Sequence, residues 1–224
     1  MSVKKGMIEK SAVLVSGGLD SATLLAERVC RDNIVYPLYI REGLRWETDE
    51  LKSLQRFLKA IHTSSLKPLT ILEFPIQPIY GNHWSVTNKK VPGFHSKDQA
   101  VYLPGRNLGL VALASLYCVQ KKIPQLYLAP LQGNPFSDSK PQFFRMFERL
   151  IRKGTGFALK IKTPYLQMTK MEVIQRGEKL PLELTFSCLN PKNGKHCGHC
   201  NKCAERQKAF KQAKVQDKTA YARK

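Results

Sequence analysis

Near its start the chain reads Ala12-Val13-Leu14-Val15-Ser16-Gly17-Gly18-Leu19-Asp20-Ser21. The first four of these residues are apolar, and a short apolar run of this kind is typical of a buried parallel strand. A Ser-Gly-Gly loop follows, and a helix is predicted from Ser21 to about Arg31, with its apolar residues on one face. A strand that passes through paired glycines into a helix is the first unit of an open α/β sheet.

The same alternation of strand and helix continues along the chain. Strands are predicted at 12–15, 34–40, 69–74, 125–129 and 158–161, and helices at 21–31, 46–61, 107–120, 141–151 and 169–176. Thr169 with Glu172 forms a capping box that opens the last of these helices. The pattern predicts an open, parallel, five-stranded sheet with helices on both faces. Residues 75–106 interrupt it as a Pro- and Gly-containing long loop, and such loops are usually functional.

The Ser-Gly-Gly loop has the chemistry of a phosphate cradle. Adjacent glycines let backbone N–H groups approach a ligand, the hydroxyls of Ser16 and Ser21 add donors, and the helix that follows adds a partial positive charge. Asp20 places a carboxylate where Mg²⁺ could sit between protein and phosphates. The loop fits neither the Walker nor the dinucleotide pattern. The alternative is a tight turn that binds nothing.

Composition sets the broad class. The chain has 224 residues, 42% of them hydrophobic, and a formal net charge of +20. The apolar share excludes a disordered chain, and we expect a soluble, cytoplasmic protein because no segment resembles a membrane span or a signal peptide. The positive charge favours affinity for nucleotides, phosphates or RNA. The alternative is a solvated, lysine-rich surface.

Four of the six cysteines gather near the C-terminus, at Cys188, Cys197, Cys200 and Cys203. Four thiolates at this spacing indicate a structural Zn²⁺ site, with an iron–sulfur cluster or no metal as the alternatives. His196 and His199 are interpreted as neighbours of that site rather than ligands. Cys30 and Cys118 are predicted to be core thiols.

The chain is divided into three parts on these patterns. Residues 1–180 are predicted to form an α/β domain that carries the phosphate cradle, 181–210 a zinc-binding element packed on it, and 211–224 a basic tail. The tail is interpreted as a frayed helix with a solvated surface.

The Ser-Gly-Gly-Leu-Asp-Ser motif after a first strand resembles the PP-loop ATP pyrophosphatase superfamily, whose fold is that of the adenine nucleotide alpha hydrolases. The resemblance implies cleavage of ATP to AMP and pyrophosphate, with the loop residues Ser16 to Ser21, Leu19 included, holding the phosphates. It further implies that AMP is transferred to an oxygen of an acceptor and leaves when nitrogen or sulfur attacks.

Three further segments resemble the 7-cyano-7-deazaguanine synthase family. They are Pro104-Gly105-Arg106-Asn107, Thr163-Pro164-Tyr165-Leu166 followed by Lys170 and Glu172, and Phe186-Ser187-Cys188 with its Cys-x-x-Cys-x-x-Cys run. With the loop they span residues 13–210 in the family's order. The resemblance implies an ATP-dependent carbon–nitrogen ligase of queuosine biosynthesis, which converts 7-carboxy-7-deazaguanine and ammonia to the nitrile with Mg²⁺ and ATP.

The resemblance places catalytic roles on Asp20, Arg106 and Lys170. Arg106 would pair with phosphate and Lys170 would neutralise developing phosphate charge. The alternatives are an arginine bonded to backbone at a helix start and a solvated helix lysine.

Acceptor-binding candidates are Arg45, Asn134 and Asp138, and Asp138 has the alternative of a helix cap. They lie in residues 41–45 and 134–140, the two segments that depart from the family's pattern. The resemblance therefore covers the residues that would act on ATP, and it does not cover those that would bind the acceptor.

Two other functions remain open. One is a PP-loop tRNA-modifying enzyme or a ligase with a different acceptor, which the basic surface would serve. The other is a regulatory module that binds ATP without catalysis. The expected partners are ATP, ammonia and a small deazapurine acid, with weak nucleic-acid affinity and no membrane, and a homodimer is left open.

Overall fold

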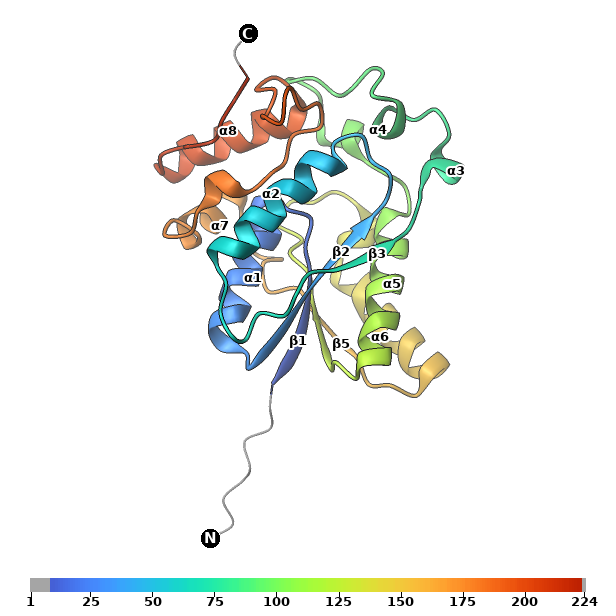
Figure 1. Ribbon diagram of the computed structural model, residues 1–224. Helices are drawn as coiled ribbons and strands as arrows, with labels where there is room; N and C mark the ends of the chain where they lie inside the picture. Colours follow the sequence, from blue (N-terminus) through green and yellow to red (C-terminus); the bar gives the residue numbers. More distant parts are fainter. Residues whose placement is uncertain (1–8, 223–224) are drawn as a thin grey trace.

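The computed structural model describes residues 9–222, and at its centre lies a sheet of five parallel strands (Figure 1). The strands run in the order β3-β2-β1-β4-β5. Their bounds are Lys10–Leu14 for β1, Ile34–Arg41 for β2, Thr70–Glu73 for β3, Gln125–Tyr127 for β4 and Lys160–Lys162 for β5. All four neighbouring pairs are parallel, which confirms the predicted sheet.

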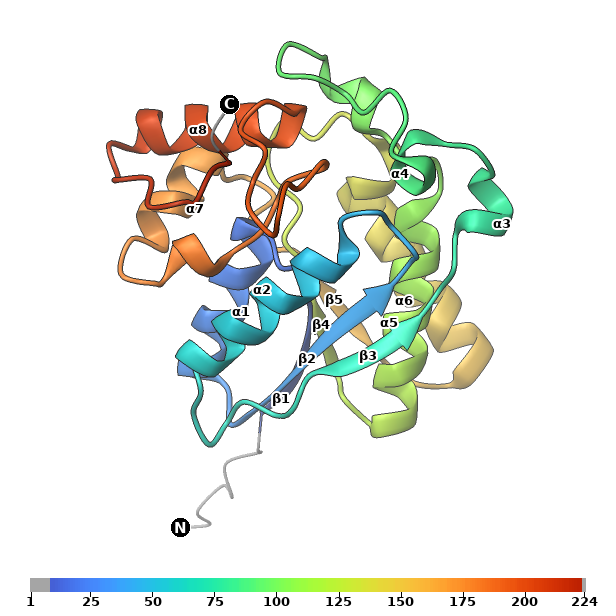
Figure 2. The same ribbon diagram turned by 45° about the horizontal axis from the view of Figure 1, so that its top comes forward.

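Helices cover both faces of this sheet, as Figures 1 and 2 show. The helices α5 (Arg106–Lys121) and α6 (Pro141–Thr155) pack on one face, and α1 (Leu19–Arg31), α2 (Glu47–Ala60) and α7 (Lys170–Arg176) lie on the other. The strands alternate between the two cores: Ala12 faces α5 and Val13 faces α1. Side chains of successive strand residues point to opposite faces, so a strand covered on both sides is apolar throughout.

The chain order reverses beside β1, and this reversal positions the functional loops. The first three strands run outward to one edge of the sheet, and β4 then returns to the other side of β1. The loops after β1 and β4 therefore leave the same end of the sheet side by side. Ligands of open α/β sheets bind at this kind of point.

The long segment 75–106 contains more structure than a loop. It holds α3 (Gln77–Tyr80), α4 (Trp84–Thr87) and a 3₁₀ helix at Asp98–Val101. The interpretation of the whole segment as a loop is wrong at these turns, because helical turns of fewer than five residues leave no periodic apolar pattern. The segment is held against the cysteine region, where Asn201 donates to the backbone oxygens of Pro92 at 3.0 Å and Ser96 at 2.7 Å.

The C-terminal part forms a second small core around the cysteines. The helix α8 (Asn201–Ala213) spans the expected boundary at residue 210, and the division into three parts stays a prediction. The described part of the tail is not a frayed helix, because α8 ends at Ala213 and residues 214–222 are not helical. Its lysines Lys211, Lys214 and Lys218 are exposed, as expected for a solvated basic surface, and residues 223–224 lie outside the described residues. Ala222 donates to the backbone oxygen of His196 at 2.8 Å, and the hydroxyl of Tyr221 donates to Asp217 at 2.7 Å.

Two thiols outside this cluster have different environments. Cys118 is fully buried in the α5 core, and burial raises the pKa of its thiol to about 12. Cys30 is exposed, so its prediction as a core thiol is wrong. It directly follows Val29, the last buried residue of α1, and therefore points away from the sheet. Within residues 9–222, no helix combines the length and the apolar character that a membrane crossing requires.

Candidate functional site

The loop Ser16–Gly18 connects β1 to α1 at the reversal of the strand order. Gly17 has a φ of +71°, and a Cβ at this position would lie 2.9 Å from Cγ of Glu50. Only glycine fits both the left-handed backbone and the close approach of α2. The serines close the turn, since the Ser16 N–H donates to Oγ of Ser21 at 3.1 Å.

The start of α1 is available to an anion. Its N-cap residue is Gly18, which has no side chain to accept a hydrogen bond from the first N–H groups of the helix. These N–H groups are therefore left uncapped beside the loop. Leu19 contributes its backbone only, because its side chain is 2% exposed and packs in the core near α8. The loop and the helix start thus leave backbone N–H groups available to an anion, and phosphate binding at Ser16–Ser21 stays a prediction.

Asp20 and Lys170 meet at the edge of this loop. The ammonium of Lys170 donates to Oδ2 of Asp20 at 2.6 Å and lies 3.2 Å from Oε1 of Glu205. Burial opposes the charge of Lys170, but the two carboxylates raise its pKa above the ordinary value. Lys170 is thus a half-buried, paired cation and not the solvated helix lysine of the alternative interpretation.

Arg106 faces the same loop from the start of α5. Its Nε donates to the Glu42 carboxylate oxygens at 2.8 and 2.9 Å, and its Nη2 also donates to that carboxylate. Glu42 is buried, with 1% of its surface exposed. Burial opposes the charge, but Glu42 raises the pKa of Arg106 above its ordinary value. The guanidinium is forked on a carboxylate, not on the backbone as the alternative had it.

Two cavities of about 200 Å³ each lie on either side of these residues. The first, which we call the sheet-side cavity, is lined by the loops after β1 and β4 and by apolar residues including Ile40, Leu110 and Leu128. The second, the cysteine-side cavity, is lined by Trp46, Phe186 and Leu189 and by the ammonium groups of Lys170 and Lys202. Four residues line both: Ser16, Asp20, Glu50 and Arg106.

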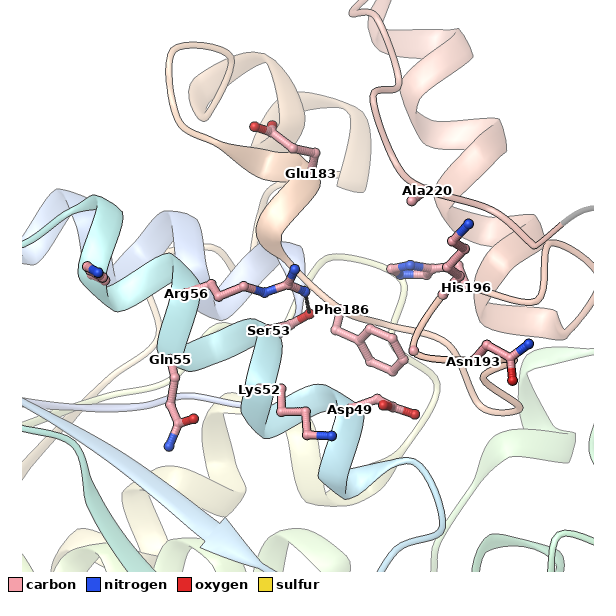
Figure 3. A pocket seen from close by; sticks show the side chains of 13 residues that line it. Asp49, Lys52, Ser53, Gln55, Arg56, Glu183, Phe186, Asn193, His196 and Ala220 are labelled. Atoms are coloured by element: carbon pink, nitrogen blue, oxygen red, sulfur yellow. Dashed lines mark hydrogen bonds between the residues drawn. The ribbon is translucent and has the colours of Figure 1, made fainter.

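A larger cavity of about 900 Å³ lies on the outer side of α2 (Figure 3). Its lining includes Lys52, Arg56 and His196, and the guanidinium of Arg56 donates to Oγ of Ser53 at 3.1 Å. Phe186 forms part of the wall of both this cavity and the cysteine-side cavity. The lining of this larger cavity includes no residue of the segment Ser16–Ser21, which we call the phosphate loop. That loop lines the two smaller cavities.

The three acceptor candidates do not come together. Asn134 lines the sheet-side cavity, whereas Arg45 is exposed at the surface. Asp138 is buried in a 3₁₀ helix at Ser137–Ser139, and its carbonyl accepts from Nδ2 of Asn107 at 3.1 Å. It does not cap α6, whose N-cap is Lys140. None of these three side chains lines the cysteine-side cavity that the structure describes.

The four cysteines of the C-terminal cluster converge. Their Sγ atoms all lie within 4.8 Å of one another, and all four residues are buried. The two histidines beside them have other partners: Nε2 of His196 accepts from the Ser187 N–H at 3.2 Å, and Nδ1 of His199 lies 2.7 Å from the Cys197 carbonyl. The cluster is a site that could hold one metal ion.

The cluster is joined directly to the phosphate loop. The Phe186 N–H donates to the Gly17 carbonyl at 2.7 Å, two residues before the first cysteine. Arg206 of α8 is 1% exposed and donates to Oγ1 of Thr185 at 2.9 Å and to Oγ1 of Thr219 at 2.8 Å. The segment that holds the four cysteines therefore fixes one wall of the cysteine-side cavity.

Sequence patterns did not find Glu42, Glu50 or Glu205. Glu50 carried a signal, since it precedes Leu54 and Phe57 at helical spacing and so falls on the buried stripe of α2. A carboxylate on an apolar stripe is buried at a cost and is a candidate functional group.

Comparison with known proteins gives consistent matches along the chain. Residues 10–214 match the sequence model of the family described as "Queuosine biosynthesis protein QueC". A protein of Leptospira interrogans named 7-cyano-7-deazaguanine synthase is 32% identical, with 93% of this chain and 89% of that protein covered. Proteins of the same name from Syntrophobacter fumaroxidans and Anaeromyxobacter dehalogenans are 32% and 29% identical, with 96% of this chain covered in each case.

Solved structures give weaker likenesses. A 4-thiouridine synthetase–RNA complex with bound ATP aligns with 93% of this chain and 51% of its own, at 15% identity and a TM-score of 0.46. An NMN synthetase from Francisella tularensis aligns with 94% of this chain at 13% identity and a TM-score of 0.45. At these scores neither likeness bears on the chemistry of the site.

Proposed function

Because the chain belongs to the family of the queuosine biosynthesis protein QueC, we propose that it is an ATP-dependent 7-cyano-7-deazaguanine synthase. It adenylates 7-carboxy-7-deazaguanine, lets ammonia displace AMP to give the amide, and adenylates the amide oxygen to give the nitrile. The observation that carries this proposal is the meeting of two cavities at Ser16, Asp20, Glu50 and Arg106. A nucleotide on one side and an acid on the other would meet at these four residues.

The chain's own residues supply binding and orientation. The loop N–H groups and the hydroxyls of Ser16 and Ser21 hold phosphate oxygens. The ammonium of Lys170 lies beside Asp20 and adds a positive charge next to this loop. If the protein acts by positioning ATP and the acceptor and by stabilising charge in the transition state, it requires no nucleophilic side chain. The apolar walls of the sheet-side cavity suit an adenine ring, and the aromatic walls of the cysteine-side cavity suit a planar deazapurine.

Asp20 fits a Mg²⁺ ligand. Its Oδ2 accepts from Lys170, but its Oδ1 is buried without a hydrogen-bond partner among the described residues. A buried, unpaired carboxylate oxygen is costly unless a cation binds it. Bound Mg²⁺ would neutralise charge on the phosphates and on the departing pyrophosphate.

The cysteine site fits Zn²⁺ in a structural role. The Sγ atoms of Cys188 and Cys200 are 4.0 Å apart, and those of Cys197 and Cys203 are 3.9 Å apart. Four sulfurs bound to one tetrahedral Zn²⁺ at about 2.3 Å lie slightly less than 4 Å from one another. In a cubane cluster each cysteine binds a different iron, which requires a wider spacing. The sulfur spacing therefore supports zinc.

The basic surface supports a weak, salt-sensitive affinity for nucleic acid, given the net charge of +20. Such binding would be independent of the reaction. A tRNA acceptor would predict that tRNA, and no small acid, stimulates the release of AMP.

The test is a reaction of the purified protein with MgATP, ammonium and 7-carboxy-7-deazaguanine, followed by mass spectrometry. We expect AMP, pyrophosphate and the nitrile, and none of them from Asp20→Asn. AMP with amide alone, or AMP that appears only with tRNA, would contradict the proposed product. ATP binding without AMP in any of these mixtures would support a non-catalytic module.

A further inference from the structure

Glu50 is a buried carboxylate in the phosphate site. It lies on the face of α2 toward the sheet, is 7% exposed, and its Cγ would be 2.9 Å from a Cβ on Gly17. It therefore packs directly against the loop that holds the phosphates. Its position is fixed from two elements, because the hydroxyl of Tyr39 on β2 donates to its Oε1 at 2.9 Å.

The second oxygen of Glu50 is not held by the part of the protein that the structure describes. Among the described residues Oε2 has no hydrogen-bond partner, yet it is not one of the fully enclosed unpaired oxygens. Glu50 lines both smaller cavities, so Oε2 is the oxygen that it can offer to a ligand there. One oxygen thus anchors the side chain and the other is free to contact a ligand.

The four residues that line both cavities differ in whether their side chains are already paired within the protein. Asp20 is paired with Lys170, Arg106 is forked on Glu42, and the Ser16 hydroxyl lies 3.2 Å from that of Ser21. Within residues 9–222, Glu50 has no lysine or arginine partner at ion-pair distance. It is the carboxyl at this junction that can gain and lose a proton without breaking a salt bridge.

The surroundings of Glu50 hold its proton near neutral pH. Burial raises its pKa to about 8, and Glu42 and Glu47 act in the same direction. Arg106 of α5 and the hydrogen bond from Tyr39 oppose this rise. The other charged groups that line its cavities are Asp20, Lys170, Lys202, Glu205 and Arg206. A base with a pKa near the working pH is the efficient one.

The second half of the proposed reaction requires such a base. The amide oxygen attacks the α-phosphorus, the bond to pyrophosphate breaks, and an O-adenylated imidate with two N–H protons results. Its positive charge makes the first proton acidic enough for water to take. When the second proton leaves, the N–H electron pair becomes the third carbon–nitrogen bond, and the C–O bond breaks with its electrons on AMP.

We infer that Glu50 is the proton acceptor of this step: its Oε2 takes the last N–H proton as AMP departs and the nitrile forms. The inference rests on the proposed function and adds a residue role to it. Tyr39 is a positioning residue, because it acts through Oε1 of Glu50.

The experiment separates the two halves of the reaction. Wild type and Glu50→Gln are each given MgATP with the carboxylate and ammonium, or MgATP with the amide alone, and amide, nitrile and AMP are measured. Glu50→Gln should form amide at nearly the wild-type rate but nitrile about 10²–10⁴-fold more slowly. Asp49→Asn on the same helix lies on the larger cavity and should match wild type in both halves.

The pH dependence gives a second readout. Nitrile formation by wild type should rise about tenfold per pH unit and level near pH 8, and Glu50→Gln should lack this break. Tyr39→Phe removes a hydrogen bond that lowers the pKa of Glu50, so its break should move to higher pH.

Thermal unfolding checks that Glu50→Gln is folded. Glu50 stays neutral in the folded protein up to about pH 8 but ionises above about 4.5 when unfolded, so stability falls across this window. Glutamine does not titrate, and the variant should gain in melting temperature over wild type as the pH rises from 4.5 to 8.

Three results would overturn the inference. They are an unchanged nitrile rate in folded Glu50→Gln, an equal loss in both half-reactions, and a pH break that stays in place in Glu50→Gln. If wild type itself makes no nitrile, the proposed function fails and the role of Glu50 fails with it. An active wild type with an active Glu50→Gln contradicts the role of Glu50 alone.

Discussion

The ammonium of Lys170 donates a 2.6 Å hydrogen bond to the Asp20 carboxylate across 150 residues of sequence. The bond joins the first turn of α7 to the first turn of α1, beside the phosphate loop. It places a cation and a carboxylate together where pyrophosphate would leave. The same Lys170 ammonium reaches Glu205 of α8 at 3.2 Å, so three helices meet at one charge cluster.

Removal of the Lys170 ammonium should slow adenylation. Lys170→Met keeps the aliphatic stem but leaves developing phosphate charge without its cation, and we expect kcat for AMP formation to fall about 10²–10³-fold. The measurement is AMP release by chromatography. Lys179→Met, an exposed lysine just beyond the same helix, is the control and should keep the wild-type rate. Equal rates in the two variants would remove Lys170 from the mechanism.

A side chain at Gly17 should prevent nucleotide binding. Gly17→Ala introduces a Cβ at a φ of +71° and 2.9 Å from Glu50, so both the loop and α2 must shift. We expect ATP affinity, measured by calorimetry, to be lost. Gly154→Ala is the matched control, because Gly154 lies in α6 with nothing within 4 Å of its added Cβ, and it should stabilise the fold by about 0.5–1 kcal/mol. Retained ATP affinity in Gly17→Ala would contradict the cradle.

Much of this architecture follows from local sequence patterns. The strands and most helices were predicted because each is a continuous apolar run or an apolar stripe, and the capping box of Thr169 and Glu172 is confirmed. The short turns at α3 and α4 are not predicted, since four residues cannot express a helical period. The helix α8 is not predicted either, because its buried positions include the polar Asn201 and Arg206 and do not form an apolar stripe.

The pairings in the site could not be predicted in the same way. Lys170–Asp20 and Arg106–Glu42 join residues far apart in sequence, and nothing local to either residue specifies its partner. The loop and the four cysteines were found because their spacing is itself the signal. The acceptor candidates came from the divergent segments and lie apart in the fold, with Arg45 exposed and Asp138 buried.

The Arg106–Glu42 pair should contribute to stability mainly through Glu42. Arg106→Met would leave a carboxylate of 1% exposure without its cation, and we expect a loss of about 3 kcal/mol in urea unfolding. Glu42→Leu combined with Arg106→Met should recover most of this loss. The exposed Arg45 is the control, and Arg45→Met should stay within about 0.5 kcal/mol of wild type. An equal loss in the single and double variants would show that packing, not the uncompensated charge, is responsible.

The metal should hold the wall of the cysteine-side cavity. Elemental analysis of native protein should find one Zn²⁺ per chain, and Cys203→Ser should lower it. Chelation should speed hydrogen exchange at residues 186–203 and at 219–222, which bond to that element, and leave β1 protected. Cys30→Ser alters an exposed thiol outside the cluster and should change nothing. Iron in place of zinc, or unchanged exchange after chelation, would refute the structural zinc.

An isotope label follows the transfer of the acceptor oxygen to AMP. The protein is given MgATP, ammonium and 7-carboxy-7-deazaguanine with both carboxylate oxygens as ¹⁸O, and the products are weighed by mass spectrometry. Adenylation of the acid and then of the amide predicts two AMP per nitrile, each with one ¹⁸O, and unlabelled pyrophosphate. Label in water or in inorganic phosphate, with unlabelled AMP, would contradict the account.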